Sequence, residues 1–498
     1  MNDSQATFFG HPRGLATLFF TEMFERFTYY GMRALLTLFL SAAVVSGGFG
    51  MTQQEAGAIY GIYTGAVYLF CVPGGWIADR ILGQRHAVWY GGILIAIGNC
   101  ILALPSSRDI FYLGLMIIVL GVGLLKPNVS AVVGALYKDQ PGYRRDAGFS
   151  LFYMGINLGA FIAPLIAGTV GEKVGYRFGF LAAGLAMVIG VVQFKMTGRY
   201  LGDAGLAPVF RNPQEKSRNV RIALAGLAAL IAVAALAYFG VIRLTANGLA
   251  WQMLIVMALI ALVVFGGILI LGGLDAAEKK RLGVIFVFFV CAALFWAGFE
   301  QAGSTFNFFA RDYTDRSWLG SWFADGQHPA SWYQSVQPIF VILLSPVFTW
   351  VWVALGRRNL DPSAPLKFGL GLIQLGLGMG VMAIAAALVV SSHGKVMPTW
   401  LMLTYLVHTT GELCLSPVGL SNVTKLSPPR FVGQMMGTWF LGAAIGNTVA
   451  GLVGGEVGSG GAEAMPGQFL LMLAVGGGAG VVVLLLSPLL RRMMGGIK

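Results

Sequence analysis

Apolar runs long enough to cross a bilayer as helices follow one another along almost the whole sequence. A helical span needs about 20 mostly apolar residues, and short polar breaks separate about fourteen such runs here. Hydrophobic residues make up 57% of the chain and charged residues 11%, whereas soluble domains carry about 25% charged residues. The sequence therefore predicts an all-α integral membrane protein. The expected spans lie near 14–41, 54–78, 86–104, 110–136, 147–171, 177–200, 220–242, 249–272, 282–310, 332–356, 367–391, 398–424, 431–455 and 467–490.

The longest polar break, Gly202–Asn219, follows the sixth expected span. Two runs rich in Ala, Leu, Ile and Val come next, and we interpret them as a transmembrane hairpin inserted between two six-span halves. Two halves around a binding site near the bilayer midplane are a common plan of secondary transporters. The predicted organisation is an N-terminal six-helix bundle over 1–201, a linker with the inserted hairpin over 202–280, and a C-terminal six-helix bundle over 281–498.

The distribution of Lys and Arg between the polar breaks predicts how the chain is oriented. If the N-terminus is cytoplasmic, the cytoplasmic breaks hold Lys and Arg in excess by roughly three to one. Both termini are therefore expected in the cytoplasm. The same loops account for the net charge of +12, so the basic character indicates a membrane protein and no nucleic-acid partner.

Seven ionisable residues lie deep inside the expected spans. At ~3 kcal/mol each on insertion scales, unpaired charges of this number would cost ~20 kcal/mol, which exceeds the ~5–15 kcal/mol of a typical net folding stability. They must therefore pair or be hydrated, which predicts a polar cavity inside the bundle. At about 100° per residue, the first expected span places several of them in one stripe together with Tyr29 and Tyr30. The seven are Glu22, Glu25, Arg26, Arg33, Lys126, Glu300 and Glu412.

Charge type and depth also suggest partners across the two halves. A buried lysine needs an acid, and Glu300, from the other half, is the expected partner of Lys126. Such a salt bridge would be a gate that responds to protonation, although a permanent structural bridge is the alternative. The first half offers Arg33 and Lys126, and the second offers Glu300 and Glu412. A zwitterion would fit across a cavity with those two ends.

Four segments of the chain read E-M-F-E-R-F-T-Y-Y-G, G-G-W-I-A-D-R-I-L-G, F-Y-M-G-I-N-L-G and G-E-L-C-L-S-P-V-G-L-S. They resemble the signatures of the proton-dependent oligopeptide transporter family, which belongs to the major facilitator superfamily. The inserted hairpin is similar to that of its bacterial branch. The resemblance implies a transporter and not an enzyme, which imports di- and tripeptides with protons by alternating access. It implies a multi-pass protein of the bacterial plasma (inner) membrane that functions as a monomer in the lipid bilayer, with the proton as coupling ion and no cofactor or metal.

The resemblance also implies roles for individual residues. The proton-coupling and gating set is Glu22, Glu25, Arg26, Arg33, Lys126 and Glu300. The substrate-binding set is Arg33, Lys126, Tyr29, Tyr30, Tyr68, Asn157, Trp296, Glu300, Gln337, Glu412, Ser416 and Trp439. Two positions depart from the family pattern, because many relatives have Asn at Gln337 and Ser at Ala160. The longer amide of Gln337 is expected to shift recognition of the peptide amino end.

The sequence disfavours three other kinds of function. A proton-coupled carrier of nitrate or another non-peptide anion or small solute is disfavoured, since an anion site would not hold the extra carboxylates Glu22, Glu25 and Glu412. An integral-membrane enzyme is disfavoured because the sequence contains no G-x-S-x-G, no H-E-x-x-H and no phosphate-binding loop. A channel or receptor is equally disfavoured, because the buried charges are spread over both halves.

Overall fold

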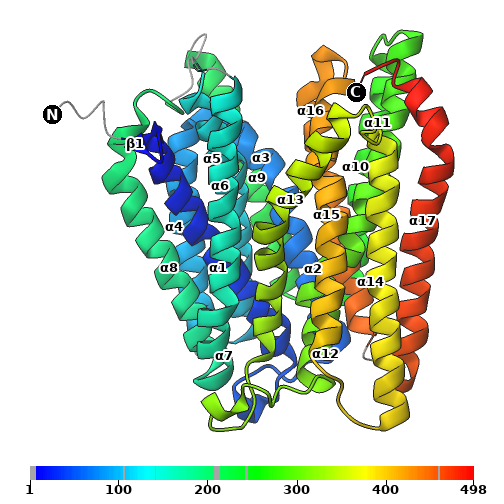
Figure 1. Ribbon diagram of the computed structural model, residues 1–498. Coiled ribbons are helices and arrows are strands. Elements are labelled where there is room, and N and C mark those ends of the chain that lie inside the picture. The colour runs from blue at the N-terminus through cyan, green and yellow to red at the C-terminus, as the bar shows by residue number, and fades with distance from the viewer. Residues whose placement is uncertain are drawn as a thin grey trace. The chain divides into compact units, whose positions relative to one another are not determined.

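The computed structural model describes residues 7–104, 107–138, 140, 142–206, 213–241, 245–457 and 460–497. Apart from two short paired strands, β1 (Thr7–Phe8) and β2 (His11–Pro12), the regular structure of these residues is helical (Figure 1). Twelve helical segments among them are long and apolar enough to cross a membrane. Two further long helices, α1 (Arg13–Ser41) and α15 (Thr399–Leu426), contain many of the predicted site residues. Together these segments match the fourteen predicted spans and confirm the all-α membrane fold.

The chain forms two compact units, and each is described by itself. Unit 1 comprises Met1–Met32 and Ala66–Leu249, and unit 2 comprises Arg33–Gly65 and Ala250–Lys498. The boundary therefore falls inside α1, and a second boundary falls inside α2 (Gln53–Leu69). The predicted organisation over 1–201, 202–280 and 281–498 describes membrane topology and stays a prediction.

Unit 1 contains the helices that follow α2 in the first part of the chain. Its α4 packs against both α5 and α8. Gly91 of α4 and Gly121 of α5 allow this approach, because a Cβ on Gly91 would lie 2.6 Å from the Gly121 carbonyl oxygen. The helices are α3 (Cys71–Ile77), η3 (Ala78–Leu82), α4 (Gln84–Ala103), α5 (Arg108–Leu136), α6 (Gly142–Ala163), η4 (Pro164–Gly168), α7 (Thr169–Lys173), α8 (Tyr176–Thr197), η5 (Gly198–Leu201) and α9 (Pro213–Tyr238).

The first part of α1 is held between α6 and α8. Thr28 Oγ1 donates a hydrogen bond of 2.9 Å to the Ala183 carbonyl of α8. Gly159 of α6 lies so close to α1 that a Cβ there would be 2.3 Å from the Met23 carbonyl oxygen. These contacts fix the segment of α1 from which Arg26 projects.

The segment G-G-W-I-A-D-R-I-L-G, residues 74–83, ends one helix and leads into the next. A turn of π-helix, η3, follows α3, and Gly83 then takes a φ of 80°, which favours glycine. Arg85 donates to the carbonyls of Gly202 and Ala204. The guanidinium thereby ties the start of α4 to the segment after α8.

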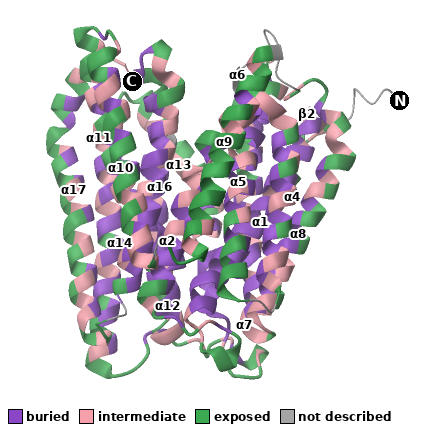
Figure 2. Ribbon diagram, turned by 180° about the vertical axis from the view of Figure 1, so that it is seen from behind, coloured by how far each residue is buried: buried purple, intermediate pink, exposed green. Residues whose placement is uncertain are grey.

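Helix α9 exposes its surface along its whole membrane-length window, in which no residue is buried (Figure 2). Its side chains are mainly Ala, Leu, Ile and Val. Helix α10 (Ala246–Leu271) comes next in the chain, and only a minority of its residues are buried. This is the exposure expected of helices that lipid surrounds.

Unit 2 contains the second part of α1, most of α2 and the C-terminal helices. Here α14 packs against α15 and α17, and α11 packs against α16. A capping box starts α11, since Glu278 N donates to Asp275 Oδ1 at 2.7 Å and Asp275 N donates to Glu278 Oε2 at 3.1 Å. The helices are α11 (Ala276–Phe299), η6 (Glu300–Gly303), α12 (Thr305–Asp312), η7 (Gly320–Trp322), η8 (Ala330–Ser335), α13 (Val336–Arg357), α14 (Ala364–Ser392), α15, η9 (Pro429–Phe431), α16 (Val432–Glu456), η10 (Ala462–Ala464) and α17 (Met465–Met493), with η2 (Val44–Ser46) between α1 and α2.

Candidate transport site

In unit 1, three charged side chains of α1 form one buried group, which we name the α1 charge cluster: Glu22, Glu25 and Arg26. Arg26 Nε lies 3.2 Å from Glu22 Oε1, one helical turn away, and also contacts Glu25 Oε2. All three side chains are buried. Two carboxylates therefore share one guanidinium inside a helix bundle, which gives the cluster one excess negative charge when both acids are ionised.

The α1 charge cluster is incompletely satisfied. Glu22 Oε2, Glu25 Oε1 and Arg26 Nη2 are buried and have no hydrogen-bond partner among the described residues. Unsatisfied buried polar atoms are destabilising by about 1–3 kcal/mol each. A site with a free carboxylate oxygen on each of two acids is able to accept a proton, which is the property that coupling requires.

The other predicted residues of unit 1 make local contacts. Lys126 Nζ lies 3.7 Å from the centroid of the Tyr68 ring, a cation–π contact. Tyr29 and Tyr30 pack edge to face with centroids 5.2 Å apart. Asn157 Nδ2 donates to the Tyr153 carbonyl of its own helix at 3.0 Å.

In unit 2, Arg33 and Glu300 form a buried salt bridge, which we name the Arg33–Glu300 pair. Arg33 Nη2 lies 3.1 Å from Glu300 Oε2. Tyr60 of α2 joins them, because its hydroxyl accepts a hydrogen bond from Arg33 Nε at 2.9 Å. The same hydroxyl lies 3.0 Å from the Glu300 carbonyl oxygen and 3.3 Å from Glu300 Oε2. All three side chains are buried.

A break in the eleventh helix positions Glu300. The α-helix α11 ends at Phe299, and the 3₁₀ turn η6 begins with Glu300. Gly303 ends that turn beside Tyr60, where a Cβ would lie 2.4 Å from the phenol oxygen. Thr37 Oγ1 donates to the Gly303 carbonyl at 2.8 Å, and Asn307 Nδ2 donates to the Ala34 carbonyl at 2.8 Å. The second part of α1 is thus hydrogen-bonded directly to the segment that carries Glu300.

A second buried carboxylate of unit 2 belongs to α15. Gln337 Nε2 of α13 donates to Glu412 Oε2 at 3.1 Å. Glu412 is 8% exposed, so its charge is largely removed from solvent. One turn further along α15, Ser416 Oγ has no hydrogen-bond partner among the described residues.

The two predicted tryptophans pack against neighbouring helices of unit 2. Gly419 of α15 lies against the Trp439 ring, and a Cβ on that glycine would clash with it. Trp296 packs edge to face with Phe299 at a centroid distance of 5.3 Å, and Gly446 of α16 lies against its Cβ. Trp439 is 8% exposed.

The expectation that intramembrane charges pair is confirmed for the α1 charge cluster and for the Arg33–Glu300 pair. The predicted bridge from Lys126 to Glu300 would join residues of different units, and it stays a prediction. Sequence reasoning missed Tyr60. No local sequence signal separates Tyr60 from Tyr63, three residues later on the same helix. Tyr60 is recognised only because its hydroxyl lies beside Arg33 and Glu300 in the folded chain.

A many-span helical protein with buried acid–base pairs in its spans has the construction of a secondary transporter. A model of the POT family matches residues 85–458 of the chain. The chain belongs to the POT family. It is a multi-pass membrane transporter and not an enzyme.

Individual relatives match over nearly the whole chain. The peptide transporter YePEPT of Yersinia enterocolitica is 43% identical over 473 residues, which cover 93% of this chain and 91% of that protein. A di-/tripeptide transporter of Lactococcus lactis subsp. cremoris is 38% identical over 450 residues, covering 89% of this chain and 88% of that protein. The crystal structure of a peptide transporter POT in complex with sulfate superimposes with a TM-score of 0.91 at 39% identity, covering 99% of this chain and 98% of the other.

Proposed function

We propose that this chain is a proton-coupled symporter that imports di- and tripeptides by alternating access. In this proposal it functions as a monomer in a bacterial inner membrane, with both termini cytoplasmic. The names of the relatives from Yersinia and Lactococcus support peptides as the substrate class. The observation that carries the proposal is the buried Arg33–Glu300 pair, because it links a group that binds carboxylates to a group that binds protons.

The energetics of a buried ion pair provide the coupling. Removing one partner from such a pair is destabilising by about 3–5 kcal/mol, because the other charge is left uncompensated. Arg33 is therefore released only when Glu300 becomes neutral, and a released Arg33 needs a new anion. A proton on Glu300 and a peptide carboxylate on Arg33 satisfy both requirements together. Neither ligand alone does so, which is the condition for symport.

The amino end of the peptide has a matching acceptor in Glu412. The amide of Gln337 donates to one oxygen of that carboxylate, and in this proposal the other oxygen receives the ammonium group. Tyr29, Tyr30, Tyr68, Asn157, Trp296, Ser416 and Trp439 complete the proposed substrate-binding set. The α1 charge cluster and Lys126 complete the proposed proton-coupling set.

The driving force follows from the charge that moves. A zwitterionic peptide carries no net charge, so import with one proton transfers one positive charge inward. The membrane potential contributes ~2.3 kcal/mol per charge per 100 mV. Accumulation should therefore respond to both the pH gradient and the membrane potential.

Uptake into liposomes that contain the purified protein tests the proposal. A pH gradient should drive accumulation of di- and tripeptides but not of tetrapeptides. Glu300→Gln should abolish accumulation driven by protons while peptide exchange between the two sides of the membrane continues. Glu463→Gln, which changes an exposed acid of η10 in the same way, is the control. If proton-driven accumulation survives intact in Glu300→Gln, Glu300 does not couple protons to transport.

Competition separates the peptide proposal from a carrier of nitrate or another small anion. Dialanine should inhibit the uptake of a labelled dipeptide, and nitrate should not. Uptake of nitrate that dialanine leaves unchanged would overturn the assignment of substrate.

A further inference from the structure

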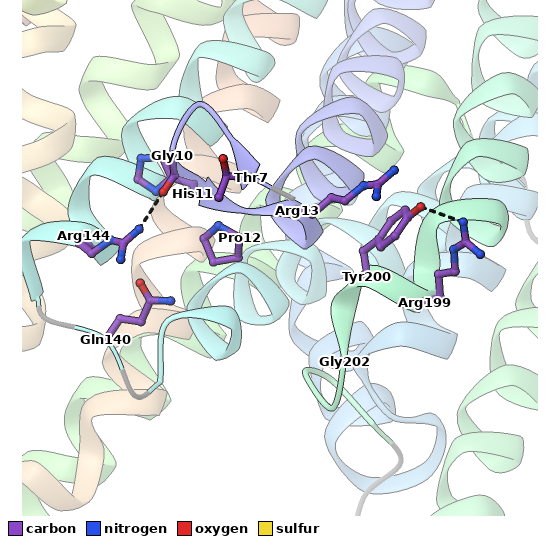
Figure 3. Close-up of a pocket in the computed structure, with 10 residues that line it drawn as sticks. All are labelled: Thr7, Gly10, His11, Pro12, Arg13, Gln140, Arg144, Arg199, Tyr200 and Gly202. Carbon is purple, nitrogen blue, oxygen red and sulfur yellow. Dashed lines mark hydrogen bonds between the residues drawn. The ribbon is translucent and has the colours of Figure 1, made fainter. Parts of the chain in front are cut away.

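A pocket of about 530 Å³ lies in unit 1, and its described lining shares no residue with the proposed transport site. It is lined by Thr7, Gly10, His11, Pro12, Arg13, Gln140, Arg144, Arg199, Tyr200 and Gly202 (Figure 3). These residues come from the strand pair before α1, the start of α1, the connection into α6, and η5 after α8. Three segments that are distant in the sequence, near residues 7–13, 140–144 and 199–202, therefore share one cavity.

The lining is strongly basic. Arg13, Arg144 and Arg199 all contribute, whereas none of the ten described lining residues is Asp or Glu. Arg144 Nη2 donates to the Gly10 carbonyl at 2.7 Å. That bond satisfies one N–H of the guanidinium but does not neutralise its charge. Three cationic side chains in one cavity attract an anion with more than one negative oxygen.

Tyr200 holds two of the guanidinium groups on one ring. Arg13 Cζ lies 3.8 Å from the ring centroid, and Arg199 Cζ lies 4.9 Å from it. Arg199 Nη2 also donates to the Tyr200 hydroxyl at 2.8 Å. Stacking on an aromatic face orients guanidinium groups and reduces the side-chain entropy that ligand binding would remove. Figure 3 shows both arginines beside Tyr200 and Arg144 across the pocket.

The pocket also holds an unsatisfied acceptor. Gln140 Oε1 is buried and has no hydrogen-bond partner among the described residues. An anion made only of acceptor oxygens would not satisfy it, but a ligand that carries a hydroxyl beside its anionic oxygens would.

We propose that this pocket binds a phosphate group that carries or adjoins a hydroxyl. Arginine suits phosphate because its planar fork donates two parallel hydrogen bonds to phosphate oxygens. Two sources present this chemistry: the headgroup of an anionic lipid such as phosphatidylglycerol, and free monohydrogen phosphate. Basic pockets at the ends of transmembrane helices bind anionic headgroups in other membrane proteins. A bound phosphate would join the start of α1 to the start of α6 and the end of α8.

Thermal unfolding of the purified full-length protein in detergent tests the proposal. The midpoint is measured during titration with phosphatidylglycerol, with phosphatidylcholine of the same acyl chains, and with inorganic phosphate. We expect a saturable rise of the midpoint with phosphatidylglycerol or with phosphate, and none with phosphatidylcholine. A rise with phosphate alone identifies the free ion, and a rise confined to phosphatidylglycerol identifies the lipid.

Substitutions assign the effect to the pocket. Arg144→Gln and Arg199→Gln should each raise the half-saturating concentration at least about ten-fold, since hydrogen bonds to charged groups are lost. Arg145→Gln removes the same charge from the next residue, which does not line the pocket, and should leave the titration unchanged. If one arginine variant does not fold, the other provides the readout. The absence of a saturable rise in the unmodified protein, or an equal weakening by Arg145→Gln, would overturn the proposal.

Discussion

The α1 charge cluster and the Arg33–Glu300 pair are both buried ion pairs between Arg and Glu, but they differ in where their partners come from along the chain. In the α1 charge cluster, Glu22, Glu25 and Arg26 all project from one helix within about one turn. In the Arg33–Glu300 pair, the two partners are separated by most of the chain, and Tyr60 from a third segment contacts both. The α1 charge cluster leaves three polar atoms without partners among the described residues. The Arg33–Glu300 pair instead joins one cation to one anion.

The difference indicates in which of the two groups the charged partners are able to separate. Partners on one helix stay together however that helix moves, so the α1 charge cluster changes by gaining or losing protons. Partners on different segments separate when those segments move, so the Arg33–Glu300 pair is able to act as a gate. We therefore propose proton acceptance for both groups, and mechanical release for the Arg33–Glu300 pair alone.

The largest effect is expected from Arg26→Ala. The substitution would leave two buried carboxylates on α1 without their guanidinium, which is destabilising by about 3–5 kcal/mol. Thermal unfolding in detergent measures this loss, and Arg357→Ala, at an exposed arginine, is the control. Replacing Glu22, Glu25 and Arg26 together by glutamine should restore most of the stability without restoring proton-driven uptake. Full transport by the triple variant would contradict a coupling role for the cluster.

The second-largest effect is expected from Arg33→Lys. Lysine keeps the charge but loses the planar fork that holds Glu300 and Tyr60 at once. We expect proton-driven uptake and peptide exchange to fall together, by about ten-fold or more, because recognition of the peptide carboxylate is impaired. Both rates are measured in the same liposomes. Arg357→Lys, the same substitution at an exposed arginine, is the control. A loss of driven uptake with normal exchange would place Arg33 in proton coupling only.

Tyr60→Phe should have a smaller effect on the same pair. The variant removes the hydroxyl that accepts a hydrogen bond from Arg33 Nε. Loss of that acceptor for a buried N–H is destabilising by about 1–3 kcal/mol. Uptake should fall by roughly ten-fold while the protein remains folded. Tyr333→Phe is the control, because it removes an equally buried phenol that lies 3.0 Å from His328 Nε2. Equal losses in both variants would mean that burial, and not the contact with Arg33, explains the effect.

The smallest effect is expected from Gln337→Asn, which shortens the amide side chain by one methylene. The shorter side chain should break the 3.1 Å hydrogen bond to Glu412, with a net change of about 0.5–1.5 kcal/mol. The KM for dipeptides should change by about three- to ten-fold, and the preference between di- and tripeptides should shift with it. Unchanged values for both substrates would show that the extra methylene has no role in specificity.

The sequence was sufficient for the fold and for contacts within one helix. Repeated apolar runs predicted the spans because a bilayer selects for length and hydrophobicity alone. The pairing of Glu22 with Arg26 follows from a spacing of four residues, which places both side chains on one face of a helix. The cost of intramembrane charge identified the remaining ionisable residues as functional candidates.

Contacts between distant segments were beyond the sequence. Charge type and depth favoured Lys126 as the partner of Glu300, whereas Glu300 Oε2 lies 3.1 Å from Arg33 Nη2. The choice depends on where α11 ends and η6 begins. Tyr60 was indistinguishable from other tyrosines of its helix for the same reason. The boundary inside α1 depends on hydrogen bonds from Thr37 and Asn307 to partners that lie more than 260 residues away, and no local pattern encodes them.

The division of α1 has a consequence for any attempt to split the protein. A fragment that ends at residue 201 would contain Arg33 and Tyr60 but would lack Glu300, which belongs with them in unit 2. The Arg33 guanidinium would lack the Glu300 carboxylate until the C-terminal fragment arrived. Co-expressed halves should therefore reassemble only when both are synthesised at the same time, and a half inserted alone should be removed by membrane proteases.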